Sequence, residues 1–362
     1  MNALLTLNSV VQDDVQAVAE ELRGTLAPLA GSTILITGGS GFLCSYFLET
    51  IAWLNDTAWH SPCRVITADN LRSGVAERIA HLAGRPDFRF ITHDVSQPFS
   101  IDEPVEWIIH GAGIASPTFY RKYPLETIDV NVMGTRHILE LAKRQNARSV
   151  LYLSSSEIYG DPDQRNIPTA EDYRGYVSCT GPRACYDESK RMAETLCGVY
   201  RNLHNVRVKV VRPFNVYGPG QRLDDGRVVP DLISAALQRR PIILHSDGRA
   251  TRSFCYIRDA IRAMCLIVMS DADGETFNVG SDEKEISVAE LAYEVSRVAG
   301  PPTLQVIHRN SDDPQYLTDN PQRRCPDLTK LRERFSWNPT VNLTEGLRRT
   351  LDSYREPQCA SR

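Results

Sequence analysis

Short apolar runs alternate with amphipathic stretches along the first 220 residues of the chain. The run Thr33–Thr37 is bounded by glycine, as expected of a strand that is buried on both faces of a parallel sheet. Similar runs recur at Arg64–Ala68, Phe88–Thr92, Trp107–His110, Ser149–Leu153 and Val206–Val211. With helical segments between them, these runs predict an α/β fold built on a doubly wound, Rossmann-like parallel sheet.

The two ends of the chain follow different patterns. Asp13–Ala30 has apolar residues at helical spacing, so residues 1–30 are expected to form a helical extension used for packing or for a dimer contact. Beyond Gly220 the strand–helix rhythm weakens and Pro and Gly become more frequent. We therefore expect a cofactor domain with the catalytic residues over 31–220. A smaller, discontinuous C-terminal substrate-binding lobe is expected over 221–362, with some segments returning to the first domain.

A glycine-rich turn, Gly38–Leu43, follows the first predicted strand. Gly38 and Gly41 allow the backbone to approach a pyrophosphate at the N-terminus of the next helix, where free N–H groups and the helix dipole favour anions. Its place at the start of an α/β repeat favours a dinucleotide site over a plain strand–helix turn. Cys44 stands where a third glycine is usual, which predicts a helix lying slightly farther out.

Two acidic residues at predicted strand ends concern the adenosine half of this site. Asp69 can accept hydrogen bonds from ribose hydroxyls and would repel a 2′-phosphate, which favours NAD over NADP. Arg72 is the opposing feature, because an arginine can pair with such a phosphate. Asp94 is positioned to meet the adenine, with a helix N-cap as the alternative.

Tyr186 and Lys190 are four residues apart, on one face of a predicted helix. A neighbouring ammonium favours the phenolate, so the pair can accept and return a hydroxyl proton. Such a pair could equally lie on a surface. The strand end Ser154–Glu157 favours the catalytic interpretation, because ligands bind beyond the carboxyl ends of parallel strands. Glu157 among apolar neighbours needs a partner or a function.

The amino-acid composition limits the partners and the cellular compartment to be expected. The 362 residues carry a formal net charge of −4 with no basic run, so neither a nucleic-acid nor a membrane partner is expected. The nine cysteines show no metal-like spacing, and their odd number is typical of reduced thiols in the cytoplasm. No apolar run approaches membrane-spanning length.

The motifs together resemble a known family. Gly38–Leu43, Ser155–Glu157 and Tyr186–Lys190 look like those of extended short-chain dehydrogenases/reductases acting on nucleotide sugars. Four more stretches resemble UDP-glucuronate decarboxylases (UDP-xylose synthases): Ser156–Pro162, Gly181–Glu188, Asp225–Val229 and Thr251–Tyr256. The resemblance runs from about residue 33 to residue 351. It implies resident NAD, a UDP-sugar substrate and a homodimer that pairs through helices including the one with Tyr186.

The resemblance also implies roles for individual residues. Tyr186 would remove the C4 hydroxyl proton with support from Ser155 and Lys190, while Ser156, Glu157 and Arg324 would serve the C5 carboxylate. The implied cofactor contacts are Gly38, Gly41, Phe42, Leu43, Asp69, Asn70, Asp94, Val95, Ala112, Tyr186, Lys190, Val216 and Arg227. The implied substrate contacts are Tyr120, Asn131, Arg183, Asn215 and Arg252. Without the resemblance, Arg324 would be taken for a surface salt-bridge residue.

The chain departs from the family at three places, of which Cys44 is one. Glu126 replaces a lysine expected near the substrate, and the segment 313–321 is longer than usual. Three other functions therefore stay open. A 4-epimerase would share the Tyr–Lys–Ser set, a 4,6-dehydratase would normally have an aspartate in place of Ser156, and an NAD-sensing regulatory protein needs no catalysis.

Overall fold

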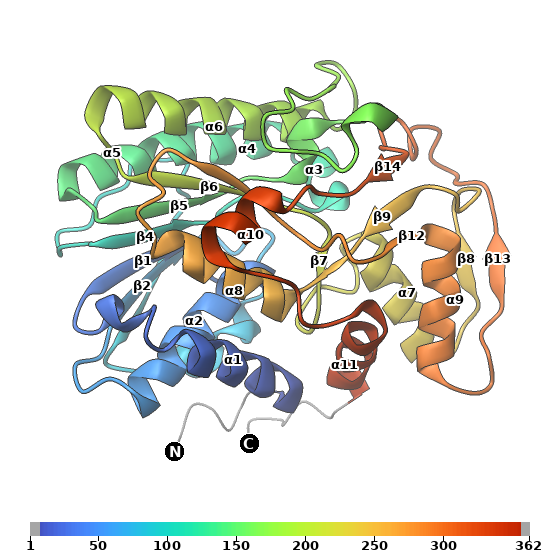
Figure 1. Ribbon diagram of the computed structural model, residues 1–362, viewed down its shortest axis with the longest axis horizontal. Coiled ribbons are helices and arrows are strands. Elements are labelled where there is room, and N and C mark those ends of the chain that lie inside the picture. Colours follow the sequence, from blue (N-terminus) through green and yellow to red (C-terminus); the bar gives the residue numbers. More distant parts are fainter. Residues whose placement is uncertain (1–7, 356–362) are drawn as a thin grey trace.

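A computed structural model describes residues 8–355 of the chain, and within them the central feature is a seven-stranded parallel sheet (Figure 1). Its strands are β1 (Thr33–Thr37), β2 (Arg64–Asp69), β3 (Phe88–Thr92), β4 (Trp107–His110), β5 (Ser149–Leu153), β6 (Val208–Pro213) and β11 (Thr276–Val279). They lie in the order β11-β6-β5-β4-β1-β2-β3. The chain starts in the middle, winds outward to β3 and then returns to build the other half from β4. The predicted doubly wound sheet is therefore confirmed, and its topological switch point lies between β1 and β4.

Helices cover both faces of this sheet (Figure 1). Ile34 and Ile36 of β1 belong to the core shared with α1 (Ser9–Leu22), α2 (Phe42–Thr57) and α8 (Ile257–Val268). Leu35, which points the opposite way, belongs to the core shared with α5 (Thr135–Gln145) and α6 (Ala184–His204). Strands in the middle of the sheet, such as β1 and β5, are consequently apolar on both sides, which explains their continuous apolar runs, whereas the edge strand β3 has no buried residue.

Two predicted boundaries differ from the structure. The sixth strand runs over Val208–Pro213 instead of Val206–Val211, because α6 continues to His204 and ends on Asn205 in a left-handed conformation. The N-terminal helix runs over Ser9–Leu22 instead of Asp13–Ala30. Asn8 caps its start, since the Asn8 side chain accepts a hydrogen bond from the Val10 N–H.

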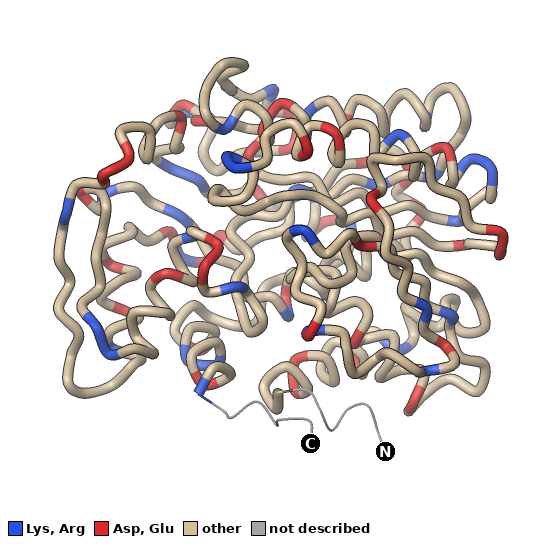
Figure 2. The backbone as a smooth tube through the Cα atoms, turned by 180° about the vertical axis from the view of Figure 1, so that it is seen from behind, with Lys and Arg blue, Asp and Glu red and all other residues tan. Residues whose placement is uncertain are grey.

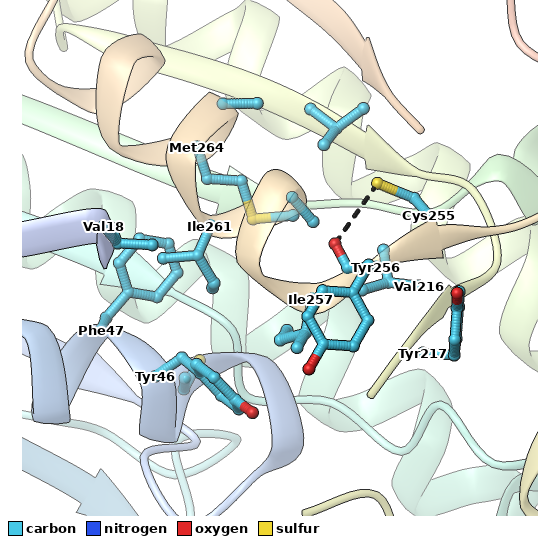
Figure 3. Packing of buried hydrophobic residues seen from close by; sticks show 14 of the residues in the cluster. Val18, Tyr46, Phe47, Val216, Tyr217, Cys255, Tyr256, Ile257, Ile261 and Met264 are labelled. Carbon is cyan, nitrogen blue, oxygen red and sulfur yellow. Dashed lines mark hydrogen bonds between the residues drawn. The ribbon is translucent and has the colours of Figure 1, made fainter. Parts of the chain in front are cut away.

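Helix α1 packs against α2, α8 and α11 (Leu343–Arg355). Figure 3 shows Val18 of α1 beside Phe47 of α2, with Ile261 and Met264 of α8 close by. The buried Asp14 carboxylate accepts hydrogen bonds from Tyr256 Oη (2.6 Å) and from the Arg349 guanidinium (2.9 Å). The N-terminal helix is thus joined to the last helix by a buried polar contact as well as by apolar packing.

A smaller group of elements lies beyond the carboxyl edge of the sheet, on the right of Figure 1. It contains α7 (Val228–Leu237), α9 (Val288–Ala299), the pair β8 (Ile242–Leu244) and β13 (Val306–His308), and a small sheet of β9 (Thr251–Ser253), β12 (Glu285–Ser287) and β14 (Arg323–Arg324). Antiparallel β9–β12 and parallel β9–β14 pairing sets Arg324 directly across from Arg252. This register brings two arginines distant in sequence to one place.

Candidate active site

A cavity of about 920 Å³ lies between the carboxyl edge of the main sheet and the smaller group of elements. Its walls include the glycine turn, the strand end Ser154–Glu157, the Tyr186–Lys190 pair and both Arg252 and Arg324. A second cavity of about 90 Å³ is lined by Asp69, Asp94 and their neighbours. Gly38, Gly41, Gly111 and Gly113 line both cavities, so the switch point of the sheet joins the two.

The glycine turn fits a dinucleotide pyrophosphate. Gly38 has a φ of +74°, and a Cβ there would lie 2.8 Å from the Ala112 backbone. Helix α2 begins at Phe42 without a side-chain cap, so its first-turn N–H groups have no acceptor within the helix. Gly41, Phe42 and Leu43 line the larger cavity at this point. The turn therefore offers an anion close backbone approach and unpaired donors.

The side chain of Cys44, where a slightly displaced helix is predicted, lies against another glycine. Its side chain is buried against Gly111, where a Cβ would come within 2.3 Å of the sulfur. The Cys44 thiol donates to the Thr37 carbonyl oxygen at 3.5 Å. The missing glycine on α2 is thus compensated by a glycine at the end of β4.

Acidic side chains surround the smaller cavity. Asp69 accepts hydrogen bonds from Ser40 N–H and Oγ–H on one oxygen and from the Leu71 N–H on the other. Asp94 accepts from Asn70 Nδ2 at 2.9 Å and from Ser96, in a turn where no helix begins. The N-cap alternative for Asp94 is therefore wrong. Asn70, Val95 and Ala112 line this cavity as well.

Glu126 lies at this adenosine end and does not line the larger cavity. Its carboxylate forms an ion pair with Arg72 at 3.0 Å. The expectation that Glu126 reverses a charge beside the substrate is therefore wrong. Instead, Glu126 engages the one arginine in the sequence that pointed toward NADP.

Tyr186 and Lys190 project from the first turns of α6 and are both 4% exposed, so the surface-pair alternative is wrong. Lys190 Nζ donates to the Leu153 carbonyl oxygen at 2.7 Å and lies 6.0 Å from the Tyr186 ring centre. Burial raises the pKa of Tyr186 to about 12, although a hydrogen bond with Ser155 and the charge of Arg227 act against this rise. Burial also lowers the pKa of Lys190 to about 8. The expected shift of the Tyr186 pKa toward phenolate by Lys190 is thus not seen in the structure.

Glu157 lies at the start of the 3₁₀ turn Ser156–Tyr159, directly after β5. Arg324 donates to both of its oxygens, and Arg183 donates to one of them. Burial alone would raise the pKa of Glu157, but the two guanidinium groups outweigh it and hold this pKa far below its usual range. Arg324 is itself 4% exposed, so its surface salt-bridge alternative is wrong.

Two further side chains complete this end of the cavity. Tyr120 stacks on Tyr186, with ring centres 5.2 Å apart and planes 10° from parallel. Arg252 is buried and donates to the Thr251 and Pro321 carbonyl oxygens. Burial and the neighbouring Arg324 lower the pKa of Arg252 to about 9. The sugar end of the cavity therefore holds three arginines around one ionised carboxylate.

Comparison with known proteins agrees with this geometry. Residues 34–280 match the model of the NAD dependent epimerase/dehydratase family. The chain belongs to that family. It is 38% identical to UDP-glucuronic acid decarboxylase 1 of Arabidopsis thaliana over 89% of this chain and 69% of that protein. For UDP-glucuronic acid decarboxylase 6 of the same plant the identity is also 38%, over 87% of this chain and 86% of that protein.

Solved structures share the fold of this family member. A UDP-glucose 4-epimerase of Thermotoga maritima superposes with a TM-score of 0.75 at 23% identity, over 89% of this chain and 98% of that one. A dTDP-glucose 4,6-dehydratase of Bacillus anthracis, solved with NAD, gives 0.74 at 22% identity, over 90% and 96%. The resemblance inferred from the motifs is thus confirmed. The cofactor is NAD, and the protein is an NAD-dependent enzyme.

The remaining residues predicted for the site lie in two kinds of position. Ser155, Ser156, Val216, Asn215 and Arg227 line the larger cavity of this epimerase/dehydratase family member. Asn131 lines neither cavity; it is buried behind Gly113 and its Nδ2 donates to Ser189 Oγ at 2.9 Å. Asn131 is therefore one implied substrate contact that the structure keeps away from the cavity surface.

The long segment 311–322 contributes to the cavity wall through Ser311, Tyr316, Asn320 and others. An ion pair of 2.6 Å joins its Asp313 to Arg121 at the end of α3 (Pro117–Lys122). Its far end reaches Arg252, which donates to the Pro321 carbonyl oxygen. The extra length thus spans the sugar end from α3 to β9.

Sequence reasoning missed three residues of the site. Asp225 is buried and accepts two donors of Arg227, which holds that guanidinium at the cavity. Asp187 is buried beside Arg183, with 3.8 Å between Asp187 Oδ2 and Arg183 Nε. Arg78 lines the larger cavity next to the glycine turn. The spacing Asp225-Gly226-Arg227 could have indicated the first, whereas nothing in the sequence marks the other two.

Proposed function

We propose that this enzyme is a UDP-glucuronate decarboxylase that forms UDP-xylose through a 4-keto intermediate. The observation that carries the proposal is the ion-paired group Glu157, Arg183 and Arg324 in the same cavity as Tyr186. Two cationic side chains beside the reacting pair suit a sugar that bears a carboxylate. The 38% identity to proteins named UDP-glucuronic acid decarboxylases supports the same substrate.

The first step removes a proton from the C4 hydroxyl. Tyr186 accepts this proton, and Ser155 stabilises the phenolate through the hydrogen bond that lowers the Tyr186 pKa. When bound at the glycine turn, NAD would accept the hydride from C4, add positive charge to the site and later return the hydride. Arg227, held by Asp225, contributes further positive potential. Burial keeps Tyr186 protonated until the positive charges of NAD and Arg227 lower its pKa.

The second step breaks the bond between C5 and the carboxylate. The 4-keto sugar is a β-keto acid, so CO2 leaves and the bonding electrons form an enolate between C4 and C5. Arg324 and Arg183 orient the carboxylate, while Glu157, kept ionised, accepts hydrogen bonds. Water supplies the proton for C5, and Tyr186 returns its proton to the C4 oxygen as the keto group is reduced.

The reaction class is tested by incubating the protein with UDP-glucuronate and following the gas and the nucleotide sugar. We expect release of CO2 and a nucleotide pentose, with no net formation of NADH. A product of unchanged mass would instead establish a 4-epimerase. In a parallel incubation with a neutral nucleotide hexose such as UDP-glucose, loss of water would establish a 4,6-dehydratase. No turnover of any nucleotide sugar with NAD still bound would favour a regulatory role.

We also propose that the protein is a homodimer and acts in the cytoplasm. Met192, Val199 and Leu203 form an exposed stripe along α6, and Leu125 of the adjacent α4 (Pro124–Asp129) is 71% exposed. A second copy would cover this apolar surface. The cysteines of residues 8–355 are all free thiols, as expected in a reducing compartment. Sedimentation equilibrium of Leu203→Glu against the unmodified chain tests the dimer.

Three further features concern charge, metal-binding side chains and membrane-spanning helices. Figure 2 shows Lys and Arg interspersed with Asp and Glu along the backbone. Within residues 8–355, no cluster of His, Cys, Asp or Glu has the arrangement of a metal site. No helix in the same range is long and apolar enough to cross a bilayer.

A further inference from the structure

Arg78 connects the glycine turn to the other side of the larger cavity. It is the last residue of the 3₁₀ turn Ala76–Arg78, which follows the loop after β2. One terminal nitrogen of its guanidinium donates to the Ser40 carbonyl oxygen within the glycine turn. The other donates to the Gly220 carbonyl oxygen, in the segment that leads from β7 (Val216–Tyr217) toward α7.

The positive charge of Arg78 has no ion-pair partner within residues 8–355, and Asp69 attracts it only weakly. Among residues 8–355, no carboxylate forms an ion pair with it, whereas Arg183, Arg262 and Arg324 are each paired with an acid. Burial lowers the pKa of Arg78, which means that its charged form is poorly solvated. The two carbonyl contacts use only two of five N–H donors. A partly buried guanidinium with free donors is a ready partner for an anion.

The position of Arg78 indicates which anion it binds. Arg78 lines the same cavity as Gly41, Phe42 and Leu43, where the first N–H groups of α2 lack acceptors. We propose that Arg78 is an NAD-binding residue that contacts the pyrophosphate together with the first turn of α2. Its planar fork suits phosphate oxygens, and its bond to Gly220 extends the contact to the far side of the cavity. This proposal depends on the cofactor alone, not on which sugar the enzyme converts.

Binding experiments without sugar test the proposal. The full chain carrying Arg78→Met is compared with the unmodified chain for NAD content after purification. Its affinities for NAD, ADP-ribose and adenosine are then measured by calorimetry or by competition. The first two ligands contain the pyrophosphate and adenosine does not. Losing a charge-assisted hydrogen bond should weaken NAD and ADP-ribose roughly 10- to 100-fold and leave adenosine within about twofold.

Two matched variants complete the design. Arg89→Met removes an arginine that is paired with Glu103 and lines neither cavity, and it should change NAD affinity by no more than about threefold. Arg78→Lys keeps the charge but not the planar fork, and it should recover part of the affinity.

Equal weakening of adenosine and NAD would overturn the proposal, because Arg78 would then only shape the turn. Unchanged NAD affinity in Arg78→Met would overturn it as well. Neither result depends on whether UDP-glucuronate is decarboxylated.

Discussion

Lys190 and Glu157 line the same cavity, yet burial affects their charges in opposite ways. Within residues 8–355, Lys190 Nζ donates to the Leu153 carbonyl oxygen alone, and burial brings the pKa of Lys190 down to about 8. Glu157 has two guanidinium partners, and its pKa lies far below the usual range. A buried charge without a counter-charge becomes able to gain or lose a proton near neutral pH, whereas a paired one stays permanently charged.

This difference divides the site into two parts with separate tasks. The Tyr186–Lys190 part can move protons, because burial brings the pKa of Lys190 to about 8 and no ion pair within residues 8–355 fixes the charge of Lys190. The part made of Glu157, Arg183 and Arg324 can orient and polarise the substrate, because its paired groups stay charged near neutral pH. Asp187 is only partly compensated: it is buried beside the cation Arg183, but one of its carboxylate oxygens has no hydrogen-bond partner. Substitutions of Tyr186, Arg324 and Asp187 test this division, and a substitution of Glu126 tests the ion pair at the adenosine end.

Tyr186→Phe should have the largest effect, because it removes the only proposed proton acceptor at C4. We expect turnover of UDP-glucuronate to fall about 100- to 10,000-fold, the range for loss of a general base. NAD content should be unchanged, since the phenol hydroxyl does not contribute to the glycine turn. Turnover and HPLC-measured NAD are compared in the same preparation. Substantial residual turnover would contradict the division into two parts.

Arg324→Gln should lower kcat/KM for UDP-glucuronate by about 100-fold, because a buried charge pair loses one partner. Its neighbour Arg323 provides the control. Arg323 pairs with Glu285, its side chain is 42% exposed and it does not line the cavity. Arg323→Gln should stay within about threefold of the unmodified protein. Equal losses in both variants would mean that β14 matters only for folding.

Asp187→Asn should change how stability depends on pH. Burial, with the charge of Glu157, raises the pKa of Asp187 to about 8 in the folded protein, above its ordinary value of 3.8. Between these pH values the folded state binds more protons than the unfolded state, so this group makes stability fall as pH rises. Asparagine does not titrate. Urea unfolding at pH 5 and pH 8 should therefore show a gain for the variant at pH 8 of a few kcal/mol at most, about 1.4 kcal/mol per unit of pKa shift.

The same experiment has a built-in check. At pH 5 the gain in stability of Asp187→Asn should be smaller than at pH 8. A loss of stability at pH 8 would mean that the ionised carboxylate supports Arg183 in the folded protein.

Glu126→Gln should have the smallest effect, because the Glu126–Arg72 pair is exposed to solvent. Removing the carboxylate frees Arg72 to meet a 2′-phosphate. We expect NADP to bind up to about fivefold more tightly, with NAD affinity unchanged. Titration with both nucleotides measures the ratio. A large gain for NADP would show that Glu126, more than Asp69, sets the preference for NAD.

Much of this protein could be predicted from local patterns. Apolar runs separated by amphipathic helices predict the doubly wound sheet, because strands buried on both faces must be apolar throughout. The glycine turn and the Tyr186–Lys190 spacing are also local, so they identified the cofactor and the redox chemistry. Boundary errors arose where a single residue decided the end of an element, as Asn205 does for α6.

Partners contributed by distant segments could not be predicted in this way. Glu157 meets Arg324 because β14 pairs with β9, which no local pattern indicates; only the family resemblance assigned both residues to the same carboxylate. Cys44 fits because Gly111 faces it, and Glu126 meets Arg72 instead of the substrate. The fold class, the cofactor turn and the Tyr–Lys pair follow from local patterns, since they depend on spacing within one or two elements. Which charges are paired depends on contacts between distant segments, because the free energy of a charged group is set by its neighbours and by its access to water.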